Sequence, residues 1–174
     1  MTLLRPNPRV PEPVRVRDQL VMVVGAGISG MAAARLLRRL DAQVIVVDAK
    51  PLEELADQQR ELARIGVELL GSVESVEDIQ LPSLAVVSPG VPPTAQIMLD
   101  LREAKVPVIS EIELAWQFCP AKLFAVTGTN GKGTTCRIAH AMLTRAGLSS
   151  RLAGNIGLPF ANLIPELTGD EVVV

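Results

Sequence analysis

The sequence has almost no aromatic residues, with one Trp, three Phe and no Tyr among 174 residues. Proteins that bind single-stranded nucleic acid stack the bases on aromatic rings, so this scarcity argues against such a function. Basic residues are not in excess either, because 17 Lys and Arg face 19 Asp and Glu and leave a net charge of −2. We therefore expect no nucleic-acid partner.

Cysteine and long apolar runs are also scarce. Cys119 and Cys136 are too few for a disulfide framework. No apolar run approaches the roughly 20 residues that cross a bilayer, and no charged-then-apolar leader precedes the first apolar run. These features predict a cytoplasmic protein without a membrane partner, and we expect a monomer.

The sequence is rich in short runs of Val, Ile, Leu and Ala that alternate with helical patterns. After a Pro-rich segment at 1–17, which predicts a mobile tail, residues 18–110 form the first predicted domain. Buried strands are expected at 20–24, 44–47, 67–70, 84–87 and 106–109, and helices after Ile28, at 52–64 and near 94–104. This alternation is typical of an α/β fold with a parallel sheet covered on both faces.

A second predicted domain occupies 111–174. Ser110 and Glu113 have the spacing of a capping box and predict a helix that continues through Trp116. Further strands are expected at 123–126 and 150–153, and helices at 132–146 and after Pro159. The chain ends in a run of β-branched residues, so we expect this domain to be interrupted within a strand.

The segment Gly25-Ala26-Gly27-Ile28-Ser29-Gly30 lies between the first predicted strand and the first predicted helix. There, such glycines permit a tight turn, close approach of a phosphate, and close packing of helix on strand. Asp48 ends the second strand and is placed to contact a ribose or a base. The pattern by itself is compatible with NAD binding, or with glycines used for packing alone. A second loop, Ser88-Pro89-Gly90, follows the fourth strand.

The segment from Thr127 to Thr135 combines glycines, a lysine and hydroxyl side chains at a strand-to-helix junction. Backbone N–H groups in such a turn surround a phosphate, and Lys132 would neutralise charge that develops in the transition state. The pattern departs from the usual loop in two respects. Only two residues separate Gly128 from Gly131, and Gly133 stands where Ser or Thr normally reaches Mg²⁺. Thr134 is therefore the candidate magnesium ligand.

In this order, the two glycine-rich segments, the Ser-Pro-Gly loop, Ile109–Leu114 and Gly154-Asn155-Ile156-Gly157 resemble the Mur ligase family, on its D-glutamate-adding branch. The resemblance implies a Rossmann-like UDP-sugar-binding domain followed by the beginning of a P-loop-type α/β ATPase domain. It implies contacts to the UDP-sugar from Gly25, Gly27, Ile28, Ser29, Gly30, Asp48, Ala49, Lys50, Ser88, Pro89, Gly90 and Asn155. It implies contacts to ATP from Gly128, Thr129, Asn130, Gly131, Lys132, Gly133, Thr134 and Thr135.

The reaction implied by the resemblance is ATP- and Mg²⁺-dependent amide formation. The carboxylate of UDP-N-acetylmuramoyl-L-alanine is phosphorylated and the amine of D-glutamate attacks the acyl phosphate, with Lys132 as the catalytic residue. In this family the magnesium carboxylate, adenine pocket and amino-acid domain follow the matched region, so we expect the 174 residues alone to be inactive. Three alternatives stay open: an NAD-dependent oxidoreductase, a non-catalytic nucleotide-sugar-binding module, and a protein similar to folylpolyglutamate synthase.

Overall fold

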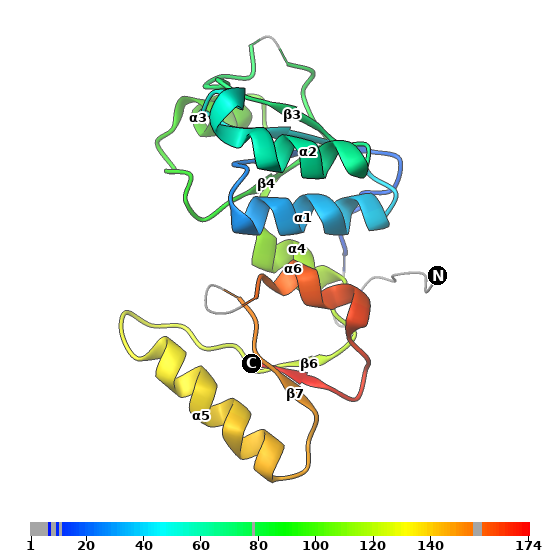
Figure 1. Cartoon of the computed structure of the whole chain (residues 1–174), viewed down its shortest axis with the longest axis vertical. Coiled ribbons are helices and arrows are strands. Elements are labelled where there is room, and N and C mark those ends of the chain that lie inside the picture. Colours follow the sequence, from blue (N-terminus) through cyan, green and yellow to red (C-terminus); the bar gives the residue numbers. More distant parts are fainter. Residues whose placement is uncertain (1–6, 8–9, 11, 78, 155–157) are drawn as a thin grey trace.

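The computed structural model describes residues 7, 10, 12–77, 79–154 and 158–174, and these form two parallel β-sheets with helices around them (Figure 1). The larger sheet has the order β3-β2-β1-β4-β5, and every neighbouring pair is parallel. Its strands are β1 (Leu20–Val24), β2 (Gln43–Val47), β3 (Glu68–Leu70), β4 (Leu84–Val87) and β5 (Val108–Ser110).

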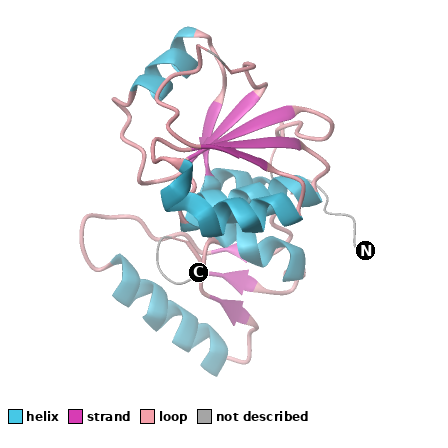
Figure 2. Cartoon of the chain, turned by 45° about the horizontal axis from the view of Figure 1, so that its top comes forward, coloured by secondary structure: helices cyan, strands magenta, loops and turns pink. Residues whose placement is uncertain are grey.

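Both faces of this sheet are buried, because successive residues of a strand point to opposite faces and almost all are apolar. In β1, Val21 and Val23 belong to one hydrophobic cluster, and Met22 and Val24 belong to another. The first cluster includes buried residues of α1 (Ile28–Arg39) and of α2 (Ala56–Arg64), which follows a 3-10 turn at Leu52–Leu55. The second cluster includes α3 (Gln96–Glu103). Figure 2 shows helices on either side of the fanned strands. The predicted Rossmann-like parallel sheet is confirmed.

The smaller sheet has the order β6-β8-β7, again parallel. It consists of β6 (Lys122–Leu123), β7 (Ser150–Arg151) and β8 (Val172–Val173), with α4 (Glu111–Gln117), α5 (Lys132–Arg145), α6 (Phe160–Leu163) and a 3-10 turn at Ile164–Glu166. The strands expected at 123–126 and 150–153 are shorter than predicted. A ladder needs a partner at every residue, and β8 provides only Val172 and Val173 as ladder partners.

The two sheets share one continuous core. The cluster that covers one face of the large sheet also contains Phe160, Leu163 and Ile164 of the second predicted domain. Helix α6 packs against α1 and α4 and so bridges the predicted boundary at 110/111 (Figure 1). The second unit is therefore attached to the first by buried apolar surface rather than by a linker.

The described part of the segment 1–17, predicted to be a mobile tail, contacts the end of α4. Asn7 is 2% exposed, its backbone N–H donates to the carbonyl of Gln117, and its side-chain amide donates to the carbonyl of Trp116. The backbone N–H of Val14 donates to the side-chain carbonyl of Gln117, and Val16 is buried. At these positions the segment finds hydrogen-bond acceptors at the end of α4, and the mobility predicted for 1–17 stays a prediction.

Among the described residues, no helix combines the length and the apolar character that a membrane span requires.

Candidate functional site

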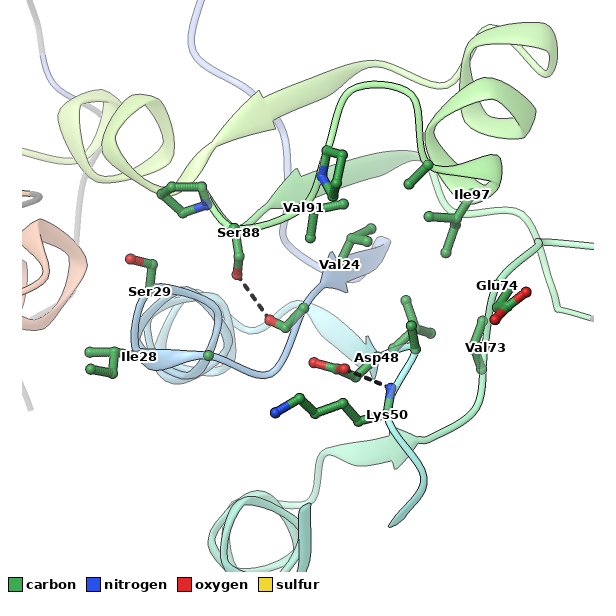
Figure 3. Close-up of a pocket in the computed structure, with 18 of the residues that line it drawn as sticks. Val24, Ile28, Ser29, Asp48, Lys50, Val73, Glu74, Ser88, Val91 and Ile97 are labelled. Carbon is green, nitrogen blue, oxygen red and sulfur yellow. Dashed lines mark hydrogen bonds between the residues drawn. The ribbon is translucent and has the colours of Figure 1, made fainter. Parts of the chain in front are cut away.

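The carboxyl ends of β1, β2 and β4 border a cavity of about 1010 Å³ (Figure 3). The chain leaves β1 toward one face of the sheet and β4 toward the other, and open parallel sheets bind ligands at such switch points. The volume is large enough for a nucleotide-sized ligand. Ten of the residues predicted to contact a UDP-sugar line this cavity, namely Gly25, Gly27, Ile28, Ser29, Asp48, Ala49, Lys50, Ser88, Pro89 and Gly90.

Two glycines of the first loop are required by the fold itself. Gly25 has a φ of +94°, which favours glycine, and a Cβ there would meet the Ser88 Cβ at 3.0 Å. A Cβ on Gly30 would lie 1.9 Å from the carbonyl oxygen of Gly25, so α1 can approach the turn only without a side chain at this position. The hydroxyl of Ser88 donates to the same carbonyl at 2.9 Å and joins the loops after β1 and β4.

Gly27 and Gly90 are different, because no heavy atom of the described residues lies within 4 Å of a Cβ built on either residue, and neither has a positive φ. Both residues line the cavity. The described residues therefore do not themselves require glycine at these two positions. The space beside their backbone is open to a ligand, as expected where a phosphate approaches the start of a helix.

Asp48 holds the first loop in place. One carboxylate oxygen accepts from the backbone N–H of Ala26 at 2.7 Å. The other accepts from the N–H of Lys50 at 2.9 Å (Figure 3). Each oxygen keeps a further lone pair for a ligand. Asp48 thus joins the glycine-rich turn after β1 to the Lys50 loop after β2, in addition to lining the cavity.

No sequence motif pointed to the residues that form the far wall of the cavity. This wall includes Val73 and Glu74 after β3, and Val91, Gln96 and Ile97 around the start of α3 (Figure 3). The carboxylate of Asp100 supports it by accepting from the N–H of Val76 and from the side chain of Gln96. Hydrogen bonds from the Ser75 hydroxyl, Gln96 and Val76 lower the pKa of Asp100.

The second unit contributes the near wall through Gly154 and Pro159. Helix α6 begins immediately after Pro159 and contacts α1, whose start carries Ile28 and Ser29. A cavity wall from the second unit was expected at Asn155, but that residue lies outside the described residues. The described residues on either side of it do reach the cavity.

The predicted phosphate loop precedes α5, and Gly128 and Gly131 have φ values of +143° and +77°. The ammonium of Lys132 donates to the carbonyl oxygens of Gly128 at 2.5 Å and Thr129 at 3.3 Å, so it closes over its own turn. Gly128, Thr129, Asn130, Gly131, Thr134 and Thr135 are exposed, whereas Lys132 and Gly133 are partly exposed. The turn has open backbone and one cation, which fits a phosphate group.

The described residues fit Mg²⁺ less well than they fit a phosphate group. Among the residues that the structure describes, no group of three or more His, Cys, Asp or Glu side chains is placed to hold a metal ion. The exposed hydroxyl of Thr134 offers one oxygen near the loop. The described residues do not fit Mg²⁺ on their own, because this ion prefers a near-octahedral shell of oxygens with carboxylate or phosphate partners.

Comparison with known proteins identifies the first unit. Residues 19–110 match the model of the family described as Mur ligase MurD-like, N-terminal domain. The UDP-N-acetylmuramoylalanine--D-glutamate ligase of Enterococcus hirae is 38% identical over 161 residues, covering 91% of this chain and 35% of that protein. The corresponding ligase of Acidobacterium capsulatum is 38% identical over 157 residues, covering 90% and 34%. The chain therefore spans about a third of the length of these relatives.

Solved structures support the fold. The UDP-N-acetylmuramate-alanine ligase MurC of Thermotoga maritima has a TM-score of 0.50 at 22% identity, covering 76% of this chain and 30% of that one. A UDP-N-acetylmuramate:L-alanyl-gamma-D-glutamyl-meso-diaminopimelate ligase of Neisseria meningitides has a TM-score of 0.54 at 17% identity, covering 89% and 51%. With the family match to 19–110, the predicted resemblance is confirmed, and the chain belongs to the MurD-like Mur ligases, whose N-terminal domain it contains.

Proposed function

We propose that this chain is the UDP-sugar-binding and phosphate-loop portion of a ligase that joins D-glutamate to UDP-N-acetylmuramoyl-L-alanine. The relatives from E. hirae and A. capsulatum carry that name. In the whole protein, ATP would phosphorylate the alanyl carboxylate, and the amine of D-glutamate would displace phosphate from the acyl phosphate. The proposal retains a cytoplasmic location and a monomer, with no nucleic-acid or membrane partner.

The observation that carries the proposal is the open space at the start of α1, between the Asp48 loop and the Ser88 loop. Gly27 presents unobstructed backbone there, and the first N–H groups of α1 favour an anion. A diphosphate bound at this point directs its two substituents to opposite ends of the cavity. The base and ribose extend toward Val73 and Glu74, and the sugar extends toward the second unit.

The phosphate loop separates this proposal from an oxidoreductase. Helix α5 begins at Lys132, directly after the Gly131 N-cap, so the Gly-Lys pair lies at a loop-to-helix junction. An NAD-dependent enzyme has no use for a second phosphate-binding turn there. Lys132 and the backbone of 128–135 would hold the phosphates of ATP, and Lys132 would neutralise charge on the γ-phosphate. Thr134 remains the proposed magnesium contact, with phosphate oxygens and further ligands needed to complete the shell.

Ligand protection against thermal unfolding tests the proposal. Stabilisation by a ligand grows as RT ln(1 + [L]/Kd) and reaches about 2.7 kcal/mol at a hundredfold excess over Kd. We expect UDP-N-acetylmuramoyl-L-alanine and UDP to raise the unfolding temperature of the chain, and NAD at the same concentration to raise it little. Protection by NAD without protection by either uridine ligand would support the oxidoreductase alternative instead.

A further inference from the structure

Glu111 is a buried carboxylate that none of the predicted motifs explains as part of a site. It is the first residue of α4 and only 2% exposed. Burial raises its pKa, while backbone N–H groups of Ala161 and Phe160 act in the opposite direction. Burying a carboxylate is unfavourable unless it is hydrogen-bonded, so its partners indicate what it does.

These partners are the first backbone N–H groups of α6. A carboxylate oxygen of Glu111 accepts from the N–H of Ala161 at 2.6 Å, across 50 residues of sequence. Helix α6 has no side-chain cap of its own, and its N-cap residue is Pro159, which has no N–H group. Glu111 therefore supplies from another element the acceptor that the start of a helix requires.

The start of α6 is directly continuous with the near wall of the cavity. Pro159 lines the cavity and immediately precedes Phe160, and Gly154 lines it at the other end of the loop. The N–H of Gly154 donates to the carbonyl of Leu158 at 3.0 Å, which closes the base of the loop. A displacement of the first turn of α6 would thus move Pro159 and Leu158, and through the Leu158 carbonyl it would act on Gly154.

We propose that Glu111 is a positioning residue for ligand binding: by fixing the first turn of α6, it sets the wall of Gly154 and Pro159 against the sugar half of the ligand. The inference rests on the proposed UDP-sugar function. The Asp48 and Val73 side of the cavity comes from loops of the first unit, whereas Gly154 and Pro159 adjoin α6, so we expect the uridine half of the ligand to depend less on Glu111 than the sugar half does.

A comparison of two ligands tests this inference. Dissociation constants for UDP and for UDP-N-acetylmuramoyl-L-alanine are measured by calorimetry well below the unfolding temperature of each variant. We expect Glu111→Ala to weaken the sugar-bearing ligand about tenfold, the effect of losing one well-placed contact, and to change UDP binding less than about twofold. Glu111→Asp keeps the charge but shortens the reach, and we expect the same selective pattern with a smaller loss.

Glu171→Ala is the matched control. Glu171 is also a buried carboxylate, but neither it nor its partners Thr168, Ser149 and Arg151 line the cavity. We expect Glu171→Ala to lower stability without changing the affinity for one ligand relative to the other. Equal weakening of both ligands by the Glu111 variants, or no weakening at all, overturns the inference while the proposed function stands. If the unaltered chain binds neither uridine ligand, the proposed function fails and the inference with it.

Discussion

The chain contains two glycine-rich turns that lead into helices, and their surroundings are opposite. The turn at 25–30 is pressed against Ser88, and α1 buries seven of its twelve residues. At 128–131, the described residues offer no such close contact to a Cβ on Gly128 or Gly131, and none of the residues of α5 is buried. Ile138 and Met142 of α5 are instead 56% and 67% exposed. Similar local sequence signals therefore lead into a helix in both places, whereas the burial of each helix depends on what packs against it.

Alanine variants of Leu37 and Met142 should show the largest difference in the free energy of unfolding. Leu37 of α1 is fully buried, so Leu37→Ala is expected to lower the free energy of unfolding by about 2–5 kcal/mol. Met142→Ala in α5 removes an exposed side chain and is expected to change it by less than about 0.5 kcal/mol. Urea unfolding followed by circular dichroism measures both. Comparable losses for the two variants would show that α5 is packed in solution.

The next largest difference in the free energy of unfolding is expected between alanine variants of Gly30 and Gly131. Gly30→Ala places a Cβ against the carbonyl of Gly25, and we expect a loss of about 3 kcal/mol, as for an overpacked core. Gly131→Ala meets no atom of the described chain within 4 Å but must hold a φ of +77°, which costs about 1 kcal/mol. The same unfolding experiment checks this pair. A tolerated Gly30→Ala would mean that α1 does not approach the turn as closely as described.

The smallest expected difference is between Glu111 and Glu171. As the pH falls, these two carboxylates should change the free energy of unfolding in opposite directions. Burial raises the pKa of Glu111 above its ordinary value of 4.5, so the folded state binds a proton more readily and gains stability as the pH falls through the raised pKa. The N–H of Thr168, followed by Arg151, lowers the pKa of Glu171, so the stability it contributes is present above pH 4.5 and is lost as the pH falls through the lowered pKa.

Glutamine variants measure these two effects. On acidification from pH 7, unfolding free energies should shift in favour of the unaltered chain relative to Glu111→Gln, and against it relative to Glu171→Gln. Shifts of the same sign in both series would contradict the opposite environments of the two carboxylates.

The large sheet and the residues of its loops could be predicted because their signals are local. Apolar runs mark strands buried on both faces, and Ser110 accepts from the N–H of Glu113 as the capping box predicts. The walls at Val73–Glu74 and at Pro159 could not be predicted, because they reach the cavity through contacts distant in sequence. Glu111 shows the same limit: its spacing suggests only a helix start, whereas its partner, Ala161, is 50 residues away.

The central claim is that the open space beside Gly27 receives the diphosphate of a uridine ligand. Gly27→Ala adds one methyl group there and, since no heavy atom of the described residues lies within 4 Å of the added Cβ, should cost only about 1 kcal/mol of stability, the difference between glycine and alanine at a helix N-cap. Gly169→Ala is the control, because its Cβ meets only the Pro120 carbonyl at 3.9 Å and the residue does not line the cavity. Calorimetric titration with UDP should show a loss of at least about tenfold in affinity for Gly27→Ala alone. Unchanged UDP affinity in a folded Gly27→Ala variant would contradict the account.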